Sequence, residues 1–183
     1  MKSYLITDPA YYHDLPSLRH YLKTAFGKHH PDVASFRDKV HSDIRPYAEA
    51  FLELGREEGT GLLLINRSVA LAHSLGFDGV HLTSTQFDEI AVAKSYGLRV
   101  FISTHSLDEA KMAQRLGADA ITVSPIFDSP GKGLPKGLDF LENILHEVND
   151  ISVFALGGIV SKDHIALLKA SQVDGFASIR YFV

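Results

Sequence analysis

The sequence predicts an α/β protein of the (β/α)8 TIM-barrel class, truncated after its eighth strand. Short β-type segments alternate with amphipathic helical segments along the 183 residues, and several β-type segments are continuous apolar runs. Such runs are typical of parallel strands that are covered on both faces. Strict alternation of strands and helices gives a parallel sheet. Eight strands favour a closed barrel, and an open doubly wound sheet is the alternative topology.

Eight strands are expected where the apolar runs lie. They are Ser3–Thr7, Asp32–Arg37, Gly61–Asn66, Gly79–Leu82, Arg99–Ser103, Ala120–Ser124, Ser152–Leu156 and Gly175–Ile179. Helices are expected between them, for example over 44–57, 107–116 and 138–149, and apolar residues recur there on one face. Ser106 with Glu109 three residues later predicts a capping box at the start of the helix over 107–116.

Three similar units place an Asp between a helix and the next strand. They are Leu75–Val80, Leu116–Ile121 and Ser171–Phe176. This is the repeat of a βα unit rather than a low-complexity sequence, and it supports the barrel.

Only a few residues follow the last expected strand, so the eighth outer helix of a complete barrel is missing. The surface of the first and last strands on which that helix would pack should be apolar and exposed, unless another chain covers it or the first helix shifts. An exposed apolar patch of that size usually marks an interface. We therefore predict a homodimer.

The composition is that of one globular domain over residues 1–183. Lys and Arg number 18 and Asp and Glu 22, for a net charge of −4, which argues against a broad nucleic-acid surface. The absence of cysteine excludes disulfides, thiolate zinc sites and a cysteine nucleophile. The apolar runs are too short to span a bilayer, and residues 1–9 do not resemble a secretion signal. We expect a cytoplasmic protein without membrane or nucleic-acid partners.

Functional groups of such barrels gather where strands end and βα loops begin. After the seventh strand, Gly157 and Gly158 would let backbone N–H groups approach an anion, and the following helix adds its positive end. Arg180, after the eighth strand, could add a guanidinium group that binds a phosphate through two N–H groups. These loops form the usual phosphate site of such barrels, so a small phosphorylated ligand is expected. The alternative is that the two glycines make only a tight turn.

Cations follow two further strands. Arg37 and Lys39 alternate after the second strand and can face the same side, which suits an anionic ligand. The alternative is a solvated charge cluster with Asp38. The Gly/Pro-rich loop over 124–136 could close over a ligand and bring Lys132 to a phosphate, or it is a passive loop.

Two histidines lie at strand ends. His81 and His105 lie at the ends of the fourth and fifth strands, and an imidazole there could move protons near neutral pH. Either could equally be a structural, hydrogen-bonded ring. No histidine pair has helix spacing with a nearby carboxylate, so a zinc site has little support.

Six segments together resemble one family. They are Asn66 with Val69–Ala72, Leu75–Leu82, Ser103–Ala110, Leu116–Asp119 with Pro125–Lys132, Ala155–Ile159 and Val173–Ala177. In this order they are similar to the strand-end signatures of the thiamine phosphate synthase/TenI superfamily, over nearly the whole chain. The resemblance implies thiamine biosynthesis.

The synthases of that superfamily join a hydroxymethylpyrimidine diphosphate to a thiazole phosphate and release pyrophosphate, with magnesium on the diphosphate. Carried over by position, the resemblance implies three groups of residues. They are Arg37, Lys39, Asn66, Ser129 and Lys132 around the substrate diphosphate, Ser103 near the reacting groups, and backbone amides at Gly158, Ile179 and Arg180 on the thiazole phosphate.

The chain departs from the synthase pattern at its metal ligands. Arg67 stands where that pattern has an Asp, and Gln86 stands at the second such Asp. Magnesium usually needs carboxylate-containing, oxygen-rich sites, so no cofactor is expected, with Mg²⁺ bound only if the chain is an active synthase. The TenI branch, the thiazole tautomerases, also lacks these ligands. Its histidine after the sixth strand is Pro125 here, so His81 or His105 would have to act as the base.

Three functions follow. The favoured one is a TenI-like, metal-independent thiazole tautomerase or a degenerate homologue of it. The second is a divergent thiamine phosphate synthase, and the third is a non-catalytic phosphate-binding regulator of the same pathway.

Overall fold

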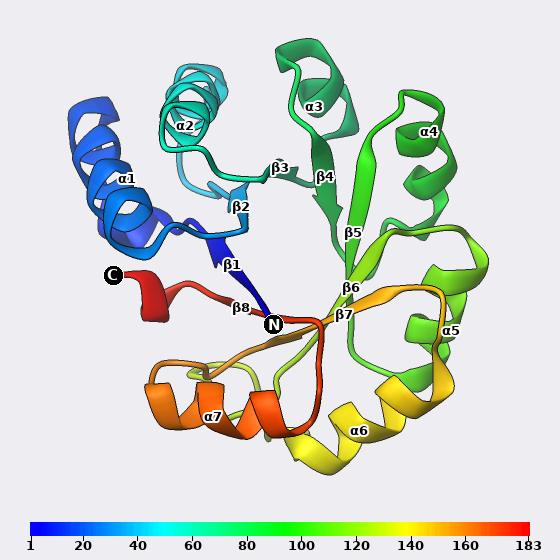
Figure 1. The fold of residues 1–183 in the computed structure, drawn as a ribbon. Helices are drawn as coiled ribbons and strands as arrows, with labels where there is room; N and C mark the ends of the chain where they lie inside the picture. The colour runs from blue at the N-terminus through cyan, green and yellow to red at the C-terminus, as the bar shows by residue number, and fades with distance from the viewer.

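The computed structural model describes residues 1–183 and shows eight parallel strands closed into a barrel inside a ring of helices (Figure 1). The strands are β1 (Lys2–Ile6), β2 (Val33–Phe36), β3 (Leu62–Asn66), β4 (Gly79–Leu82), β5 (Arg99–Thr104), β6 (Ala120–Val123), β7 (Ser152–Leu156) and β8 (Gly175–Ser178). Each strand pairs with the next, and β8 pairs with β1 to close the ring. The predicted strands are confirmed to within one residue at each end, and the open-sheet alternative is wrong.

Seven α-helices and three short 3-10 helices lie in the connections. The α-helices are α1 (Leu15–His29), α2 (Arg45–Glu57), α3 (Val69–Leu75), α4 (Ile90–Ser95), α5 (Leu107–Arg115), α6 (Gly137–Glu147) and α7 (Lys162–Ala170), and the 3-10 helices are η1 (Pro9–Tyr11), η2 (Phe87–Glu89) and η3 (Arg180–Phe182). Ser106 caps α5 by accepting from the N–H of Glu109, but the Glu109 carboxylate accepts from His105 rather than Ser106. The predicted capping box is therefore half formed. None of the helices combines the length and apolar character that crossing a membrane requires.

The repeated Asp residues tie neighbouring strands together at their amino ends. Asp78, Asp119 and Asp174 each accept, at 2.7–2.8 Å, from the N–H of a residue at the start of the preceding strand. Asp32, just before β2, does the same for Ser3 in β1. A carboxylate accepting from a backbone N–H is a strong, charge-assisted hydrogen bond. The repeat found in the sequence thus fixes strand register at the end of the barrel opposite the candidate site.

Apolar side chains fill both the inside of the barrel and the layer between strands and helices. The interior cluster contains large rings, among them Tyr4, Phe101 and Phe154, which meet edge-on or tilted with centroids 5.4–5.8 Å apart. Toward the carboxyl ends, the inward side chains become polar, as at His81 and Thr122. The packed half is a rigid base, and the polar half faces a cavity.

The 3-10 helix η3 lies between α1 and α7, where an eighth outer helix would pack (Figure 1). Phe182 is 2% exposed and stacks on Phe176 of β8, with ring centroids 6.0 Å apart and planes 2° from parallel. It also meets His29 of α1 edge-on. The expectation of a bare apolar seat is therefore wrong, because the chain's own aromatic residues cover it. A bare apolar patch therefore no longer supports the homodimer, which stays a prediction.

Replacing Phe182 with alanine should destabilise the fold, because it removes the ring that covers Phe176. A buried Phe→Ala change costs about 3–5 kcal/mol of unfolding free energy. Urea denaturation would measure it, with Val183→Ala as the control, since Val183 is 48% exposed. A loss below about 1 kcal/mol for Phe182→Ala would contradict this role, because surface substitutions usually stay within about 0.5 kcal/mol.

Candidate active site

A cavity of about 510 Å³ opens at the carboxyl ends of the strands, enclosed by the βα loops. All twelve site residues predicted from the sequence line it. They are Arg37, Lys39, Asn66, His81, Ser103, His105, Ser129, Lys132, Gly157, Gly158, Ile179 and Arg180. Closure of the ring is what brings together residues so far apart in the chain.

The turns after β7 and β8 lie against each other on one side of the cavity. The hydroxyl of buried Ser178 donates to the carbonyl of Ile159 at 2.7 Å, which links the two turns. The N–H groups of Gly158, Ile179 and Arg180 donate to no atom of the chain. Free N–H groups next to a cation form an anion-binding arrangement.

Gly158 has φ +71°, a backbone conformation that favours glycine. A Cβ on Gly158 would also collide with Phe127 and Asp128 of the loop after β6. The adjacent Gly157 also approaches Pro125 of the same loop closely, with 2.8 Å between a built Cβ and the Pro125 Cα. Both glycines therefore allow the loop after β6 to pack onto the turn after β7.

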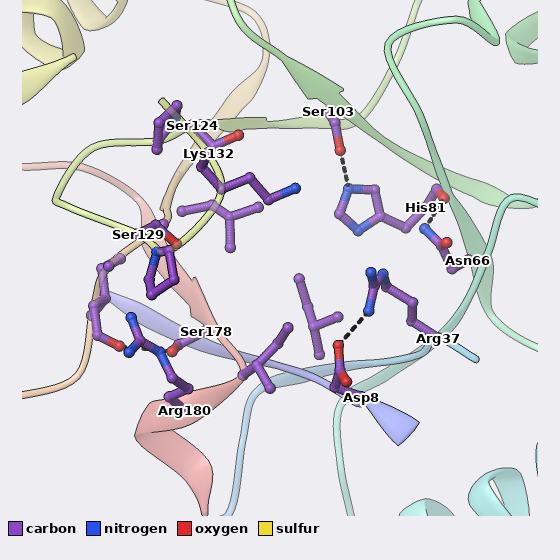
Figure 2. Close-up of a pocket in the computed structure, with 18 of the residues that line it drawn as sticks. Asp8, Arg37, Asn66, His81, Ser103, Ser124, Ser129, Lys132, Ser178 and Arg180 are labelled. Carbon is purple, nitrogen blue, oxygen red and sulfur yellow. Dashed lines mark hydrogen bonds and ion pairs between the residues drawn. The ribbon is translucent and has the colours of Figure 1, made fainter. Parts of the chain in front are cut away.

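The lining of the cavity is positive, and three of its cations lie away from the turns after β7 and β8. The side chains lining the cavity include four cations, Arg37, Lys39, Lys132 and Arg180, against the single carboxylate of Asp8, which leaves +3 on a chain of net charge −4. Arg37 Nη1 donates to Asp8 Oδ2 at 2.7 Å (Figure 2). The repulsion from Arg37, with partial burial and the charge of Lys132, lowers the pKa of Lys39. Gathering like charges in this way is unfavourable unless an anion binds among them.

A carboxylate behind the cations holds the loop after β2 in place. Asp38 accepts from the Tyr12 hydroxyl and from His41 Nδ1, each at 2.8 Å, and from the backbone N–H groups of Val40 and His41. The His41 ring also stacks on Tyr47 of α2, with centroids 4.3 Å apart. Asp38 is therefore not the partner of Arg37 or Lys39, and it orients the loop that carries them.

This loop should loosen as the pH rises. The hydrogen bond with Asp38, helped by the His13 carbonyl, raises the pKa of His41. A raised pKa means that protonated His41 stabilises the fold fully below its unfolded pKa of about 6.5, and that this stabilisation is lost as the pH rises through the folded value. Burial alone would raise the pKa of Asp38, but its hydrogen bonds lower it overall. The hydrogen bond between Asp38 and His41 therefore also weakens in strong acid, where the carboxylate becomes protonated. NMR titration should find the pKa of His41 above the ordinary imidazole value of about 6.5, and Asp38→Asn should lower it. An unchanged His41 titration in that variant would contradict the role of this hydrogen bond.

His81 lies inside the barrel below the cavity and is only 3% exposed. Its Nδ1 is 2.6 Å from the Tyr4 hydroxyl, and its Nε2 is 3.1 Å from Ser103 Oγ. Burial, with the charge of Arg37, lowers the pKa of His81 to about 4. A neutral ring with both nitrogens occupied is poorly suited to act as a general base.

His105 is exposed at the rim. Its Nδ1 lies 3.0 Å from the carbonyl of Ser124. Because a carbonyl only accepts, Nδ1 carries the proton in the neutral ring and Nε2 is left as the acceptor. Of the two histidines, His105 is the one whose free nitrogen could take a proton.

Three smaller polar groups complete the lining. Asn66, at the end of β3, donates through Nδ2 to the His81 carbonyl at 3.0 Å, which fixes its amide. Ser103 presents its hydroxyl from β5. Ser129 and Lys132 come from the loop after β6, and Lys132 points across the cavity toward Ser103 and His81 (Figure 2).

The donor set does not fit a magnesium ion. Nowhere do three His, Cys, Asp or Glu side chains come together. Gln86 is engaged by Thr83, Glu89 and the Arg67 carbonyl, and Arg67 is a cation in a left-handed conformation (φ +71°). Asp8, the one carboxylate in the cavity, is paired with Arg37. Magnesium is usually held by carboxylates together with substrate phosphates, whereas the two expected ligand positions here hold the cation Arg67 and the neutral amide Gln86.

Several lining residues were missed from the sequence. Asp8 directly follows β1 and Ser178 ends β8, so both stand at the strand-end positions that were read for other residues. Thr83 and Ser84 follow β4, and Tyr11 comes from η1. Their position after a strand was the available signal, but a lone Asp or Ser there has no spacing pattern to distinguish it.

Comparison with known proteins places the chain in a family. A family model described as thiamine monophosphate synthase matches residues 3–182. The thiamine-phosphate synthase of Chloroflexus aurantiacus is 33% identical over 154 residues, which are 80% of this chain and 69% of that protein. That of Lactococcus lactis subsp. cremoris is 30% identical over 157 residues, 80% of this chain and 71% of that protein.

The fold comparison agrees. A solved structure of the thiamine phosphate pyrophosphorylase from Pyrococcus furiosus superposes with a TM-score of 0.79 at 28% identity, covering 97% of this chain and 85% of that one. The matched stretches span 56% to 71% of the lengths of eight curated relatives. The family match covers every strand end that lines the cavity, and the chain therefore belongs to the thiamine monophosphate synthase family.

Proposed function

We propose that the chain joins a hydroxymethylpyrimidine diphosphate to a thiazole phosphate and releases pyrophosphate, the reaction for which its relatives are named. One observation carries the proposal. The cavity is lined by two sets of groups suited to anions, the amide turns at Gly158 and Ile179–Arg180 and the cations Arg37, Lys39 and Lys132. A coupling reaction has a phosphate on one substrate and a diphosphate on the other, whereas the substrate of a tautomerase has one phosphate and a singly charged carboxylate, which needs fewer cations. This favours the synthase over the TenI-like function expected from the sequence.

The residues divide the chemistry between them. The amides near Gly158 hold the thiazole phosphate and so fix the position of its ring. When the pyrimidine carbon–oxygen bond breaks, its electron pair leaves with the pyrophosphate oxygen, and the cations stabilise that charge. A thiazole ring nitrogen then donates its lone pair to the pyrimidine carbon to form the new bond. Neither step needs a general base, which agrees with a buried, neutral His81.

Thiazole tautomerisation is the second candidate, and His105 favours it. Its Nε2 is free at the rim while Nδ1 is bound to the Ser124 carbonyl. If it is the base, His105→Gln should abolish metal-free isomerisation of the thiazole carboxylate phosphate. A protein that binds both phosphates without turnover would instead support the regulator.

The test is a coupling assay with both substrates, with chromatographic detection of thiamine phosphate. Because Arg67 and Gln86 stand where the magnesium ligands are expected, coupling should persist in EDTA, with less than about a tenfold change in kcat/KM, or about 1.4 kcal/mol, on adding magnesium. Coupling that requires magnesium would contradict our conclusion that these residues do not fit a magnesium ion, but it would still support the synthase function. No coupling under either condition, with tautomerisation present, would replace the synthase by the second candidate.

A further inference from the structure

A continuous hydrogen-bonded row runs from the barrel interior to the cavity. It starts at the Tyr4 hydroxyl, which is fully buried, passes through both nitrogens of His81 at 2.6 and 3.1 Å, and ends at Ser103 Oγ. Thr122 Oγ1 lies 3.4 Å from Ser103 Oγ as well. Tyr4 and Thr122 are outside the cavity, whereas His81 and Ser103 line it. Both ring nitrogens of His81 are engaged by Tyr4 and Ser103, so the hydroxyl of Ser103 is the polar group that the row offers to a ligand (Figure 2).

The surroundings of Tyr4 set the direction of the row. Its ring is enclosed by Phe101 and Phe154, whose centroids lie 5.6 and 5.8 Å from its own. The only hydrogen-bond partner of its hydroxyl is His81 Nδ1. A buried O–H without an acceptor is costly, so Tyr4 donates to Nδ1. Ser35 Oγ meets no hydrogen-bond partner at ideal geometry, but its hydroxyl lowers the pKa of Tyr4 against the effect of burial, as a donor to the Tyr4 oxygen does, so Ser35 does not take the Tyr4 proton.

The direction of the hydrogen bond from Tyr4 also determines which atom donates in the hydrogen bond between His81 and Ser103. When Nδ1 accepts, the neutral ring carries its proton on Nε2. Nε2–H then donates to Ser103 Oγ, and the Thr122 hydroxyl can donate to the same oxygen. Both lone pairs of Ser103 are thereby used inside the protein. The remaining O–H of Ser103 is free to donate only into the cavity.

We propose that Tyr4 and His81 are positioning residues that fix Ser103 as a hydrogen-bond donor toward an anionic oxygen of the ligand. The identity of that oxygen, on the departing diphosphate, rests on the proposed function. In the reverse direction, the Ser103 O–H would donate to His81 Nε2. Ser103 would then present only a lone pair to the ligand, which would repel an anionic oxygen. Tyr4, from outside the cavity, and His81, with both ring nitrogens engaged, thus set which end of the Ser103 hydroxyl meets the substrate.

Nitrogen-15 NMR of the ligand-free protein tests the direction without any assay of activity. The His81 ring should carry its proton on Nε2 across pH 5.5–8, with Nδ1 unprotonated, and its signals are identified by their loss in His81→Gln. Ser35→Ala should leave this pattern unchanged, whereas Tyr4→Phe should remove the preference for it. A proton on Nδ1 in the wild type, or a tautomer that shifts in Ser35→Ala, would overturn the proposal.

Two amide replacements then test the link to Ser103. A Gln amide nitrogen can take the place of Nε2 and still donate to Ser103, whereas the shorter Asn reaches only the position of Nδ1. Losing one donor to developing charge lowers kcat by roughly 100-fold, so His81→Asn should show that loss with KM changed less than about threefold. His81→Gln should retain kcat to within about tenfold. Thermal unfolding and titration with inorganic phosphate check that both variants are folded.

The outcomes separate the two proposals. Equal kcat for the Asn and Gln variants, both folded, would overturn the positioning role while leaving the synthase intact. A wild-type protein that couples nothing removes the proposed function, and the NMR pattern alone then decides the direction of the row.

Discussion

Replacing Gly158 with alanine is expected to weaken binding of the thiazole phosphate and coupling by about 100-fold, because a displacement of 1 Å in such a site has effects of that order. Gly158 has φ +71°, and a Cβ there would meet backbone atoms of Phe127 and Asp128. The turn must move, and its free N–H moves with it. Calorimetric titration with inorganic phosphate and the coupling assay measure the two effects.

Gly97→Ala is the matched control. Gly97 has φ +74° but nothing within 4 Å of its built Cβ, and it lies after α4, outside the cavity. It imposes a similar backbone penalty, of roughly 1–2 kcal/mol, without a collision at the site. Pyrophosphate binding at Arg37 should survive in Gly158→Ala, which would separate a local effect from unfolding. Equal phosphate affinity in wild type and Gly158→Ala would refute an anion site at this turn.

Arg37→Met is expected to weaken pyrophosphate binding by roughly 30-fold, since removing one partner of a partly buried charge pair costs about 2 kcal/mol. The change removes one cation of the cavity and leaves the Asp8 carboxylate, whose side chain is 25% exposed, without its partner. The unpaired carboxylate would then repel the diphosphate. Calorimetry with pyrophosphate in EDTA measures the loss.

Two further variants separate the causes. Arg37→Met combined with Asp8→Asn should recover part of the affinity, because the repelling charge is gone while the cation is still missing. Arg19→Met breaks an exposed ion pair with Glu53 on the outer helices, also 2.7 Å long, and should leave binding unchanged. Unaltered pyrophosphate affinity in Arg37→Met would show that the diphosphate does not bind among these cations.

The sequence was sufficient for the strands and for the residues at their ends. Each strand is a local apolar run, and its carboxyl end directly precedes the loop that carries the functional group, as at Arg37, His105 and Gly157. Once the number of strands indicates a closed ring, all these loops must meet at one end. That is why every predicted site residue lines a single cavity, although the roles of those residues stay predictions.

The sequence was insufficient where a property depends on what neighbouring strands contribute. His81 looked like a candidate base because it stands at a strand end. Its burial between Tyr4 of β1 and Ser103 of β5, which lowers its pKa to about 4, comes from strands far away in the chain. The tautomerase expectation rests on the missing metal ligands at Arg67 and Gln86, whereas the distribution of charge on two sides of the cavity favours the synthase.

By itself, the sequence determined the order of strands and helices, the barrel class and the positions that face its open end, because these follow from periodicities of two and 3.6 residues along the chain. Only the tertiary structure decided that Asp8 is the partner of Arg37, that Asp38 instead holds His41 and Tyr12, and that Phe182 covers Phe176. Ion pairs, burial and pKa shifts depend on distances between side chains that are remote in sequence, and closing the ring is what sets those distances.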